Sequence, residues 1–248
     1  MKRQIHQTTL TDRTIPGGRQ IALEFRADGS PAVPGTLLVP AASGPVPAAL
    51  LIHGYSSRKE HMAESVGMAL FRRAIASLAI DLPLHGTRRE PSAPGGMGDP
   101  LVLIRHWRLA VQETRLAIHF LRARTEIDGE RIGVVGYSLG SFLATLLASE
   151  EKAVRAVVVA AGGDLPSDIP FATLARTVVD PLRAVRKLKG RPLLVVHGRR
   201  DRTVLPEQAQ RLFDAAHEPK EIRWWDTGHY LPAAAIDDTT DWLAERLA

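Results

Sequence analysis

Residues 132–140 read Ile-Gly-Val-Val-Gly-Tyr-Ser-Leu-Gly, an apolar run that ends in the pattern G-x-S-x-G. This pattern is typical of a nucleophile elbow, a sharp turn between a strand and a helix that exposes one serine hydroxyl at the end of a sheet. Gly136 and Gly140 fit such a turn because a Cβ at either position would crowd it. Residues 141–148 can continue the turn as an apolar helix. This context predicts that Ser138 is a nucleophile.

The composition is typical of a globular protein with a sizeable core, because 45% of the 248 residues are hydrophobic and 24% are charged. The chain contains no cysteine, which excludes disulfides, thiolate nucleophiles and cysteine-based metal sites. Its first residues lack the apolar stretch of a signal peptide, and it has no run of about 18 apolar residues that could span a membrane. We therefore expect a cytoplasmic protein without a membrane partner.

The net charge of +5 raises the question of nucleic-acid binding. The basic residues are mostly arginines that are scattered through every segment, and short pairs such as residues 88–89 and 199–200 do not form a basic stripe with interleaved aromatics. We expect a solvated, arginine-rich surface and no nucleic-acid partner.

From residue 50 onward, short apolar runs alternate with longer helical patterns, as in parallel βα units. Strands are expected at residues 48–52, 76–80, 132–135, 153–160, 192–196 and 221–225, and helices at 60–74, 101–124, 139–150, 206–216 and 233–247. Residues 19–25 and 34–40 are expected to form an antiparallel hairpin at the sheet edge. The pattern predicts one α/β domain over residues 1–248.

Two stretches interrupt this alternation. Residues 86–100 are rich in proline and glycine, and residues 161–190 separate two strands by more than a standard connection. In open parallel sheets, ligands bind beyond the carboxyl ends of the strands, where both stretches begin. We expect both to shape a substrate pocket, the second as a small cap-like insertion, and both are too short for a large separate cap.

A base and an acid are needed because a serine hydroxyl is a weak nucleophile until an adjacent base takes its proton. His229 is the candidate base, in a loop between the last expected strand and the last expected helix. Asp201 is the candidate acid, because it follows a buried strand and gives the chain order Ser, Asp, His of a hydrolase triad. Asp164, after the preceding strand, is an alternative acid, and Asp226 is expected to serve the turn before His229.

The tetrahedral intermediate needs two hydrogen-bond donors for its oxyanion. One is expected to be the backbone N–H of Leu139, directly after the nucleophile. The other is expected to be the N–H of Tyr55, because Gly54 lets the loop after the strand at 48–52 approach closely. His53 in the same loop is a rival base, but we expect it to brace the loop.

Three further residues are candidate substrate contacts: His85, Met97 and Trp107, which lie in or beside the stretch at 86–100. For His85 the alternative is a role in shaping the loop. The chain has no H-E-x-x-H, calcium-loop, Rossmann or P-loop motif, so we expect no metal and no cofactor.

Taken together, these residues resemble the α/β-hydrolase superfamily over essentially the whole chain, from residues 53–54 through 81–86 and the elbow to Asp201 and His229. Within it, Arg-Ile-Gly-Val-Val-Gly-Tyr-Ser at residues 131–138 is similar to the dienelactone-hydrolase-like and feruloyl-esterase-like branch. The resemblance implies a mostly parallel, eight-stranded sheet with helices on both faces, a minimal cap, no cofactor and acyl transfer to water. Dienelactone hydrolases use a cysteine nucleophile, which this chain lacks, so we do not expect that activity.

The sequence thus predicts a serine hydrolase that cleaves carboxylic esters of small to medium size through an acyl-serine, as a monomer or homodimer. The same triad also serves thioesterases and serine peptidases of the prolyl-oligopeptidase type, and both stay open as alternatives. A ligand-binding protein on a hydrolase scaffold is the non-enzymatic alternative, because fold does not fix function.

Overall fold

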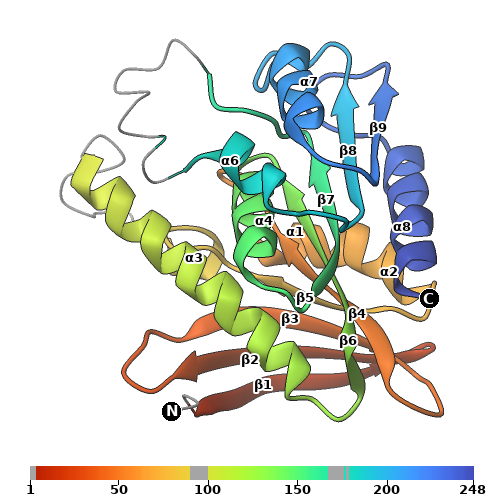
Figure 1. Ribbon diagram of the computed structural model, residues 1–248. Helices are drawn as coiled ribbons and strands as arrows, with labels where there is room; N and C mark the ends of the chain where they lie inside the picture. Colours follow the sequence, from red (N-terminus) through yellow and green to blue (C-terminus); the bar gives the residue numbers. More distant parts are fainter. Residues whose placement is uncertain (1–3, 90–99, 167–175, 177–178) are drawn as a thin grey trace.

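A single sheet runs through the computed structural model, which describes residues 4–89, 100–166, 176 and 179–248 (Figure 1). Within these residues the sheet has nine strands in the order β1-β2-β3-β5-β4-β6-β7-β8-β9. The strands are β1 (Ile5–Ile15), β2 (Gly18–Ala27), β3 (Val33–Pro40), β4 (Val46–Ile52), β5 (Ala76–Ile80), β6 (Ile127–Tyr137), β7 (Val154–Ala160), β8 (Leu193–Gly198) and β9 (Lys220–Trp225). Strands β4 to β9 are mutually parallel, and β1 to β3 extend the sheet antiparallel beyond β5.

Helices cover both faces of the parallel part of the sheet (Figure 1). One face packs on α3 (Pro100–Arg122), α4 (Leu139–Glu150), α6 (Pro181–Arg186) and α7 (Pro206–Ala215). The other face packs on α8 (Ala233–Leu247) and on a helical stretch made of α1 (Lys59–Met62), the π-helix η1 (Ala63–Gly67) and α2 (Met68–Phe71). Neighbouring residues of β4 enter different cores, because Leu50 belongs to the first and Leu51 to the second. This two-sided burial explains why the central strands are apolar throughout.

The expected α/β architecture is confirmed, with one strand more than the eight expected. The additional strand is β1, which pairs with β2 along the sheet edge. Nine of its eleven residues are exposed, and its sequence is rich in threonine and polar residues. Because β1 has no buried face, it lacks the apolar signal that identified the other strands.

The register of the sheet places the ends of five parallel strands next to one another. Ile52 at the end of β4 pairs with Gly136 of β6, and Tyr137 of β6 pairs with Ala160 of β7. At the sheet edge, Gly198 of β8 pairs with Trp225 of β9. The loops that follow these strands therefore leave the sheet side by side.

Candidate active site

The turn between β6 and α4 has the backbone of a nucleophile elbow. Ser138 adopts φ 50° and ψ −114°, a conformation that L-residues rarely adopt. A Cβ on Gly136 would lie 2.3 Å from the carbonyl oxygen of Gly140, and a Cβ on Gly140 would lie 2.2 Å from that of Ile52. The pattern G-x-S-x-G is therefore a steric requirement of this turn. The next residue, Ser141, donates its Oγ to the Ser138 carbonyl at 2.6 Å.

Ser138, Asp201 and His229 meet above the ends of β6, β8 and β9. His229 Nε2 lies 3.0 Å from Ser138 Oγ, and His229 Nδ1 lies 2.8 Å from Asp201 Oδ2. The other carboxylate oxygen of Asp201 accepts the amides of Thr203 at 2.8 Å and Val204 at 3.1 Å. Because a carboxylate only accepts, Nδ1 carries the proton and Nε2 is left to accept the serine hydroxyl. The side chains are thus aligned for proton transfer from serine to histidine.

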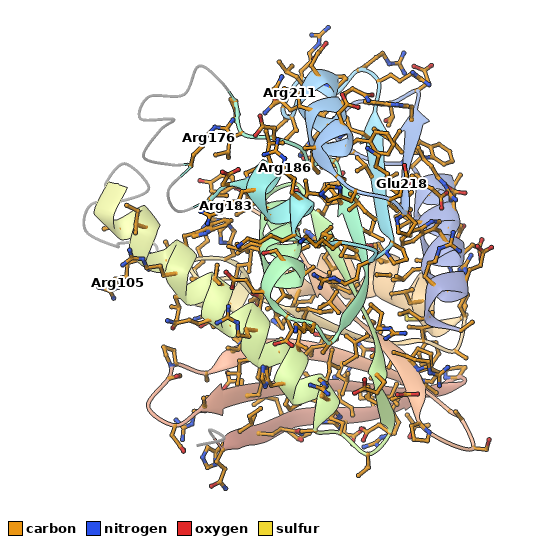
Figure 2. All side chains as sticks on the ribbon, in the orientation of Figure 1. Arg105, Arg176, Arg183, Arg186, Arg211 and Glu218 are labelled. Atoms are coloured by element: carbon orange, nitrogen blue, oxygen red, sulfur yellow. The ribbon has the colours of Figure 1, made fainter. Side chains whose placement is uncertain are left out.

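The two other aspartates lie outside this arrangement. Asp226 is exposed and pairs with Arg200 at 3.3 Å. Asp164 is buried and binds Arg176 through both carboxylate oxygens at 3.0 Å, and Arg211 at 3.2 Å (both arginines are labelled in Figure 2). Burial alone would raise the pKa of Asp164, but these arginines outweigh it and hold the pKa below its usual value. Asp164 therefore fastens the chain after β7 to α7.

The loop after β4 lies directly against the nucleophile. A Cβ on Gly54 would lie 3.2 Å from the Ser138 Cβ, so only glycine allows this approach without displacement. The amide of Tyr55 makes no backbone hydrogen bond among the described residues. Leu139 is the first residue of α4, so its N–H has no partner within the helix. Both amides expected to bind an oxyanion are thus available beside Ser138.

His53 sits inside this loop with both ring nitrogens engaged. Its Nε2 accepts the amide of Leu82 at 3.1 Å, so Nδ1 carries the proton and donates to the Gly54 carbonyl at 2.7 Å. Burial lowers the pKa of His53 to about 4, which keeps the ring neutral. The ring therefore holds the peptide that contains the Tyr55 amide, in agreement with a bracing role.

A buried ion pair anchors the other end of the same loop. Lys59 Nζ lies 2.8 Å from Asp81 Oδ2, and the Lys59 amide donates to Asp81 Oδ1 at 2.8 Å. The amide and hydroxyl of Thr87 also donate to Asp81, each at 3.0 Å. Burial raises the pKa of Asp81, but the contacts with Lys59 and Thr87 outweigh it, so that the pKa is lowered overall. Sequence reasoning missed this pair, because lysine side chains are normally exposed.

The expected substrate contacts have different surroundings. His85 is nearly buried beside the loop after β4, with its ring 5.5 Å from that of Tyr55 and 5.3 Å from that of His53. Trp107 is partly buried and packs against the first core. Met97 lies outside the described residues.

Two residues that sequence reasoning gave no role contact the triad. The hydroxyl of Tyr137 donates to the carbonyl of His229, and its ring lies edge-on to the imidazole at 5.8 Å. His197 Nε2 donates to the Val204 carbonyl at 2.9 Å and lies 3.5 Å from Asp201 Oδ2. Tyr137 directly precedes Ser138, and His197 lies four residues before Asp201. This position within the motif-bearing stretches is the feature of the sequence that could have identified them.

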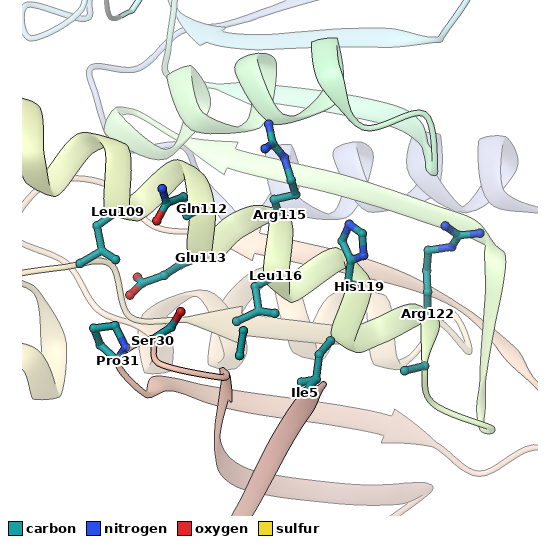
Figure 3. A pocket seen from close by; sticks show the side chains of 12 residues that line it. Ile5, Ser30, Pro31, Leu109, Gln112, Glu113, Arg115, Leu116, His119 and Arg122 are labelled. Atoms are coloured by element: carbon teal, nitrogen blue, oxygen red, sulfur yellow. The ribbon is translucent and has the colours of Figure 1, made fainter. Parts of the chain in front are cut away.

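A groove of about 940 Å³ lies elsewhere, between α3 and the N-terminal strands (Figure 3). Its apolar lining includes Ile5, Pro31, Leu109 and Leu116, and it contains none of the triad residues. In the described part of the chain, no three carboxylate or imidazole side chains converge to hold a metal ion. None of the described helices combines the length and apolar character that crossing a bilayer requires.

Two protein-family models match this chain. A family model described as "Serine hydrolase (FSH1)" matches residues 107–240, a range that contains Ser138, Asp201 and His229. A second, described as "Esterase FrsA-like", matches residues 14–167. A curated relative, "Putative esterase YitV" of Bacillus subtilis (strain 168), is 23% identical over 80% of this chain and 88% of its own length.

Solved structures share the fold at low sequence identity. A cold-adapted esterase from an Arctic intertidal metagenomic library superimposes with a TM-score of 0.75 and 20% identity, over 100% of both chains. Acetyl xylan esterase 1 from Thermoanaerobacterium sp. JW/SL YS485 superimposes with a TM-score of 0.78 and 18% identity, over 100% of this chain and 89% of the other. Since each of the two family models matches more than half of the sequence, the chain belongs to the α/β-hydrolase superfamily, within its serine hydrolases and esterases.

Proposed function

We propose that the protein is a carboxylester hydrolase in which Ser138, His229 and Asp201 form the catalytic triad. One observation carries the proposal: His229 lies within hydrogen-bond distance of both Ser138 Oγ, at 3.0 Å, and Asp201 Oδ2, at 2.8 Å. A buried carboxylate, an oriented imidazole and a strained serine in this order are what acyl transfer through serine requires. The family membership supports the same chemistry.

In the proposed first step, His229 Nε2 takes the proton of Ser138 as Oγ attacks the ester carbonyl carbon. Asp201 stabilises the imidazolium that forms. The amides of Tyr55 and Leu139 donate to the oxyanion, and a donor of this kind contributes about 10²–10³ in rate. His229 then gives its proton to the leaving alcohol as the C–O bond breaks, which leaves an acyl-serine.

In the second step, His229 takes a proton from water as the water oxygen attacks the acyl-serine. The second tetrahedral intermediate collapses, the proton passes from His229 to Ser138 Oγ, and the carboxylic acid leaves. The cycle consumes one ester and one water and needs no cofactor. We propose esters of small to medium size as substrates.

Hydrolysis of p-nitrophenyl acetate and butyrate tests the proposal. The wild-type chain should hydrolyse both esters, and Ser138→Ala should abolish this activity. A fluorophosphonate probe should label the wild-type chain stoichiometrically and leave Ser138→Ala unlabelled. A folded wild-type chain that neither turns over esters nor reacts with the probe would contradict the proposal and favour a binding protein. Thioesters and aminoacyl amides assayed in parallel would separate the thioesterase and peptidase alternatives.

A further inference from the structure

The phenol of Tyr137 forms hydrogen bonds with the backbone of the histidine loop (residues 226–232, between β9 and α8) at two points. Its hydroxyl donates to the carbonyl of His229, and it accepts the amide of Leu231 at 3.3 Å. Tyr137 is also the residue directly before Ser138 in the elbow. One side chain therefore joins the backbone of the nucleophile to the backbone on both sides of Tyr230.

The histidine loop is held differently on its other side. On that side lies the acid loop (residues 199–205, between β8 and α7). Its Arg199 amide donates to the Trp225 carbonyl at 2.8 Å, and its Arg200 amide donates to the Thr227 carbonyl at 2.9 Å. Gly198 allows this close approach, since a Cβ there would lie 2.1 Å from the Gly228 carbonyl oxygen. Toward the elbow, the described residues supply hydrogen bonds to the loop backbone through the Tyr137 hydroxyl alone.

The two attachments have different consequences for the triad. The backbone contacts with the acid loop lie on the Asp201 side of the histidine loop, whereas the phenol contacts it from the Ser138 side. Burial raises the pKa of Tyr137 to about 12, so the hydroxyl stays a donor throughout the range in which a histidine base works. The ring adds an edge-on contact with the imidazole at 5.8 Å.

From these contacts we propose that Tyr137 is a positioning residue that fixes His229 relative to Ser138 through the backbone of the histidine loop. The inference rests on the proposed triad. Without the hydroxyl, the His229 carbonyl and the Leu231 amide lose their partner and the loop is free to shift away from the elbow. A displacement of about 1 Å in a reacting group can lower the rate about 10²-fold.

Tyr137→Phe tests the proposal, because it keeps the ring and removes only the hydroxyl. We expect kcat for p-nitrophenyl acetate to fall about 10- to 100-fold with little change in KM, and fluorophosphonate labelling to slow in parallel. Tyr230→Phe is the matched control: Tyr230 is the adjacent tyrosine, 82% exposed, and its hydroxyl makes no hydrogen bond among the described residues. Its activity should stay within about twofold of wild type.

Two further readouts separate positioning from a general loss of structure. The downfield proton resonance of the His229–Asp201 hydrogen bond, assigned by its loss in His229→Ala, should broaden in Tyr137→Phe and stay sharp in Tyr230→Phe. Replacing Tyr137 with 3,5-difluorotyrosine lowers the phenol pKa while keeping the side chain in place at neutral pH. Activity of that variant should fall at a lower pH than in the wild type, where the hydroxyl ionises near pH 12.

The outcomes distinguish this inference from the proposed function. Wild-type kcat and a sharp resonance in Tyr137→Phe would overturn the positioning role, even if Ser138→Ala is inactive. The positioning role would also be overturned if the difluorotyrosine variant lost activity at the same alkaline pH as the wild type. This test remains decisive even if Tyr137→Phe does not fold. Undiminished turnover in Ser138→Ala would instead overturn the proposed triad, and the resonance would still report whether the loop depends on the hydroxyl.

Discussion

Gly54 lies against Ser138 so closely that a methyl group on its Cα would come within 3.2 Å of the Ser138 Cβ and 3.3 Å of the Tyr137 carbonyl oxygen. Both distances are tighter than ordinary van der Waals contact, and one of the two atoms belongs to the elbow backbone. A Cβ at this position would therefore require the loop that carries the proposed oxyanion donor, or the elbow, to shift by a few tenths of an ångström.

Gly54→Ala should consequently move the Tyr55 amide away from the oxyanion and lower kcat about 10-fold or more. Gly44→Ala is the matched control, since a Cβ at Gly44 would meet no atom within 4 Å. Steady-state hydrolysis of p-nitrophenyl butyrate compares the two variants. Equal activities for both would argue against Tyr55 as the donor.

Asp201→Asn should lower kcat by about 10⁴-fold while leaving the fold intact, because an amide no longer selects the Nδ1–H tautomer or stabilises the imidazolium. Asp226→Asn should keep wild-type activity, since the Asp226 side chain is 78% exposed.

Asp164→Asn should keep kcat but lower the urea concentration at the midpoint of unfolding, because Arg176 and Arg211 lose their anionic partner. Kinetics and urea unfolding of the three variants provide the measurement, and an active Asp201→Asn enzyme is incompatible with the assigned acid.

Stability should fall in mild acid because the pKa of His53 is lowered from 6.5 to about 4 in the folded chain. Between these values the unfolded chain binds a proton that the folded chain excludes, so the contribution is complete above pH 6.5 and is lost as the pH falls toward 4. The loss amounts to roughly 2 kcal/mol between pH 7 and pH 5. Urea unfolding at both pH values measures it.

His53→Asn should show a smaller loss of stability between pH 7 and pH 5 than the wild type does. His217→Asn serves as the control, because His217 is exposed. Its dependence on pH should match that of the wild type. If His53→Asn lost as much stability between pH 7 and pH 5 as the wild type, the protonation of His53 would not explain the loss in acid.

Lys59→Met should destabilise the protein by about 3–5 kcal/mol, because it leaves the carboxylate of Asp81 buried without its cation. The double variant with Asp81→Asn should recover part of this loss, since the uncompensated charge is then removed. Urea denaturation of the single and double variants measures the coupling. Strictly additive effects would mean that the pair contributes no interaction energy.

The sequence predicted most of the architecture because most of the parallel strands contain buried apolar runs that alternate with helical patterns. Helix α4 spans Leu139–Glu150 and α8 spans Ala233–Leu247, as expected, and β5 spans Ala76–Ile80. The expected helix at 60–74 is interrupted by the π-helix η1, which sequence periodicity does not reveal. In η1, Gly67 comes close to β5, where a Cβ would lie 3.0 Å from Ser77 Oγ.

Motif spacing was sufficient to select the residues that meet at Ser138, because a parallel sheet brings the ends of its strands to one edge. It was not sufficient to find Lys59, Tyr137 or His197. Their contacts depend on which loop a side chain enters and on how deeply it is buried. A hydrogen bond from a side chain to a backbone carbonyl, as Tyr137 makes, cannot be recognised from the residue type or from the hydrophobic period of the sequence.

The separation along the chain between Ser138 and His229 is 91 residues, and the acid stands between them. During synthesis from the N-terminus, the serine therefore emerges well before the base that would activate it. Until β8 and β9 have joined the sheet, Ser138 lacks the imidazole that we propose activates it. The onset of esterase activity would then report that the C-terminal edge of the sheet has folded.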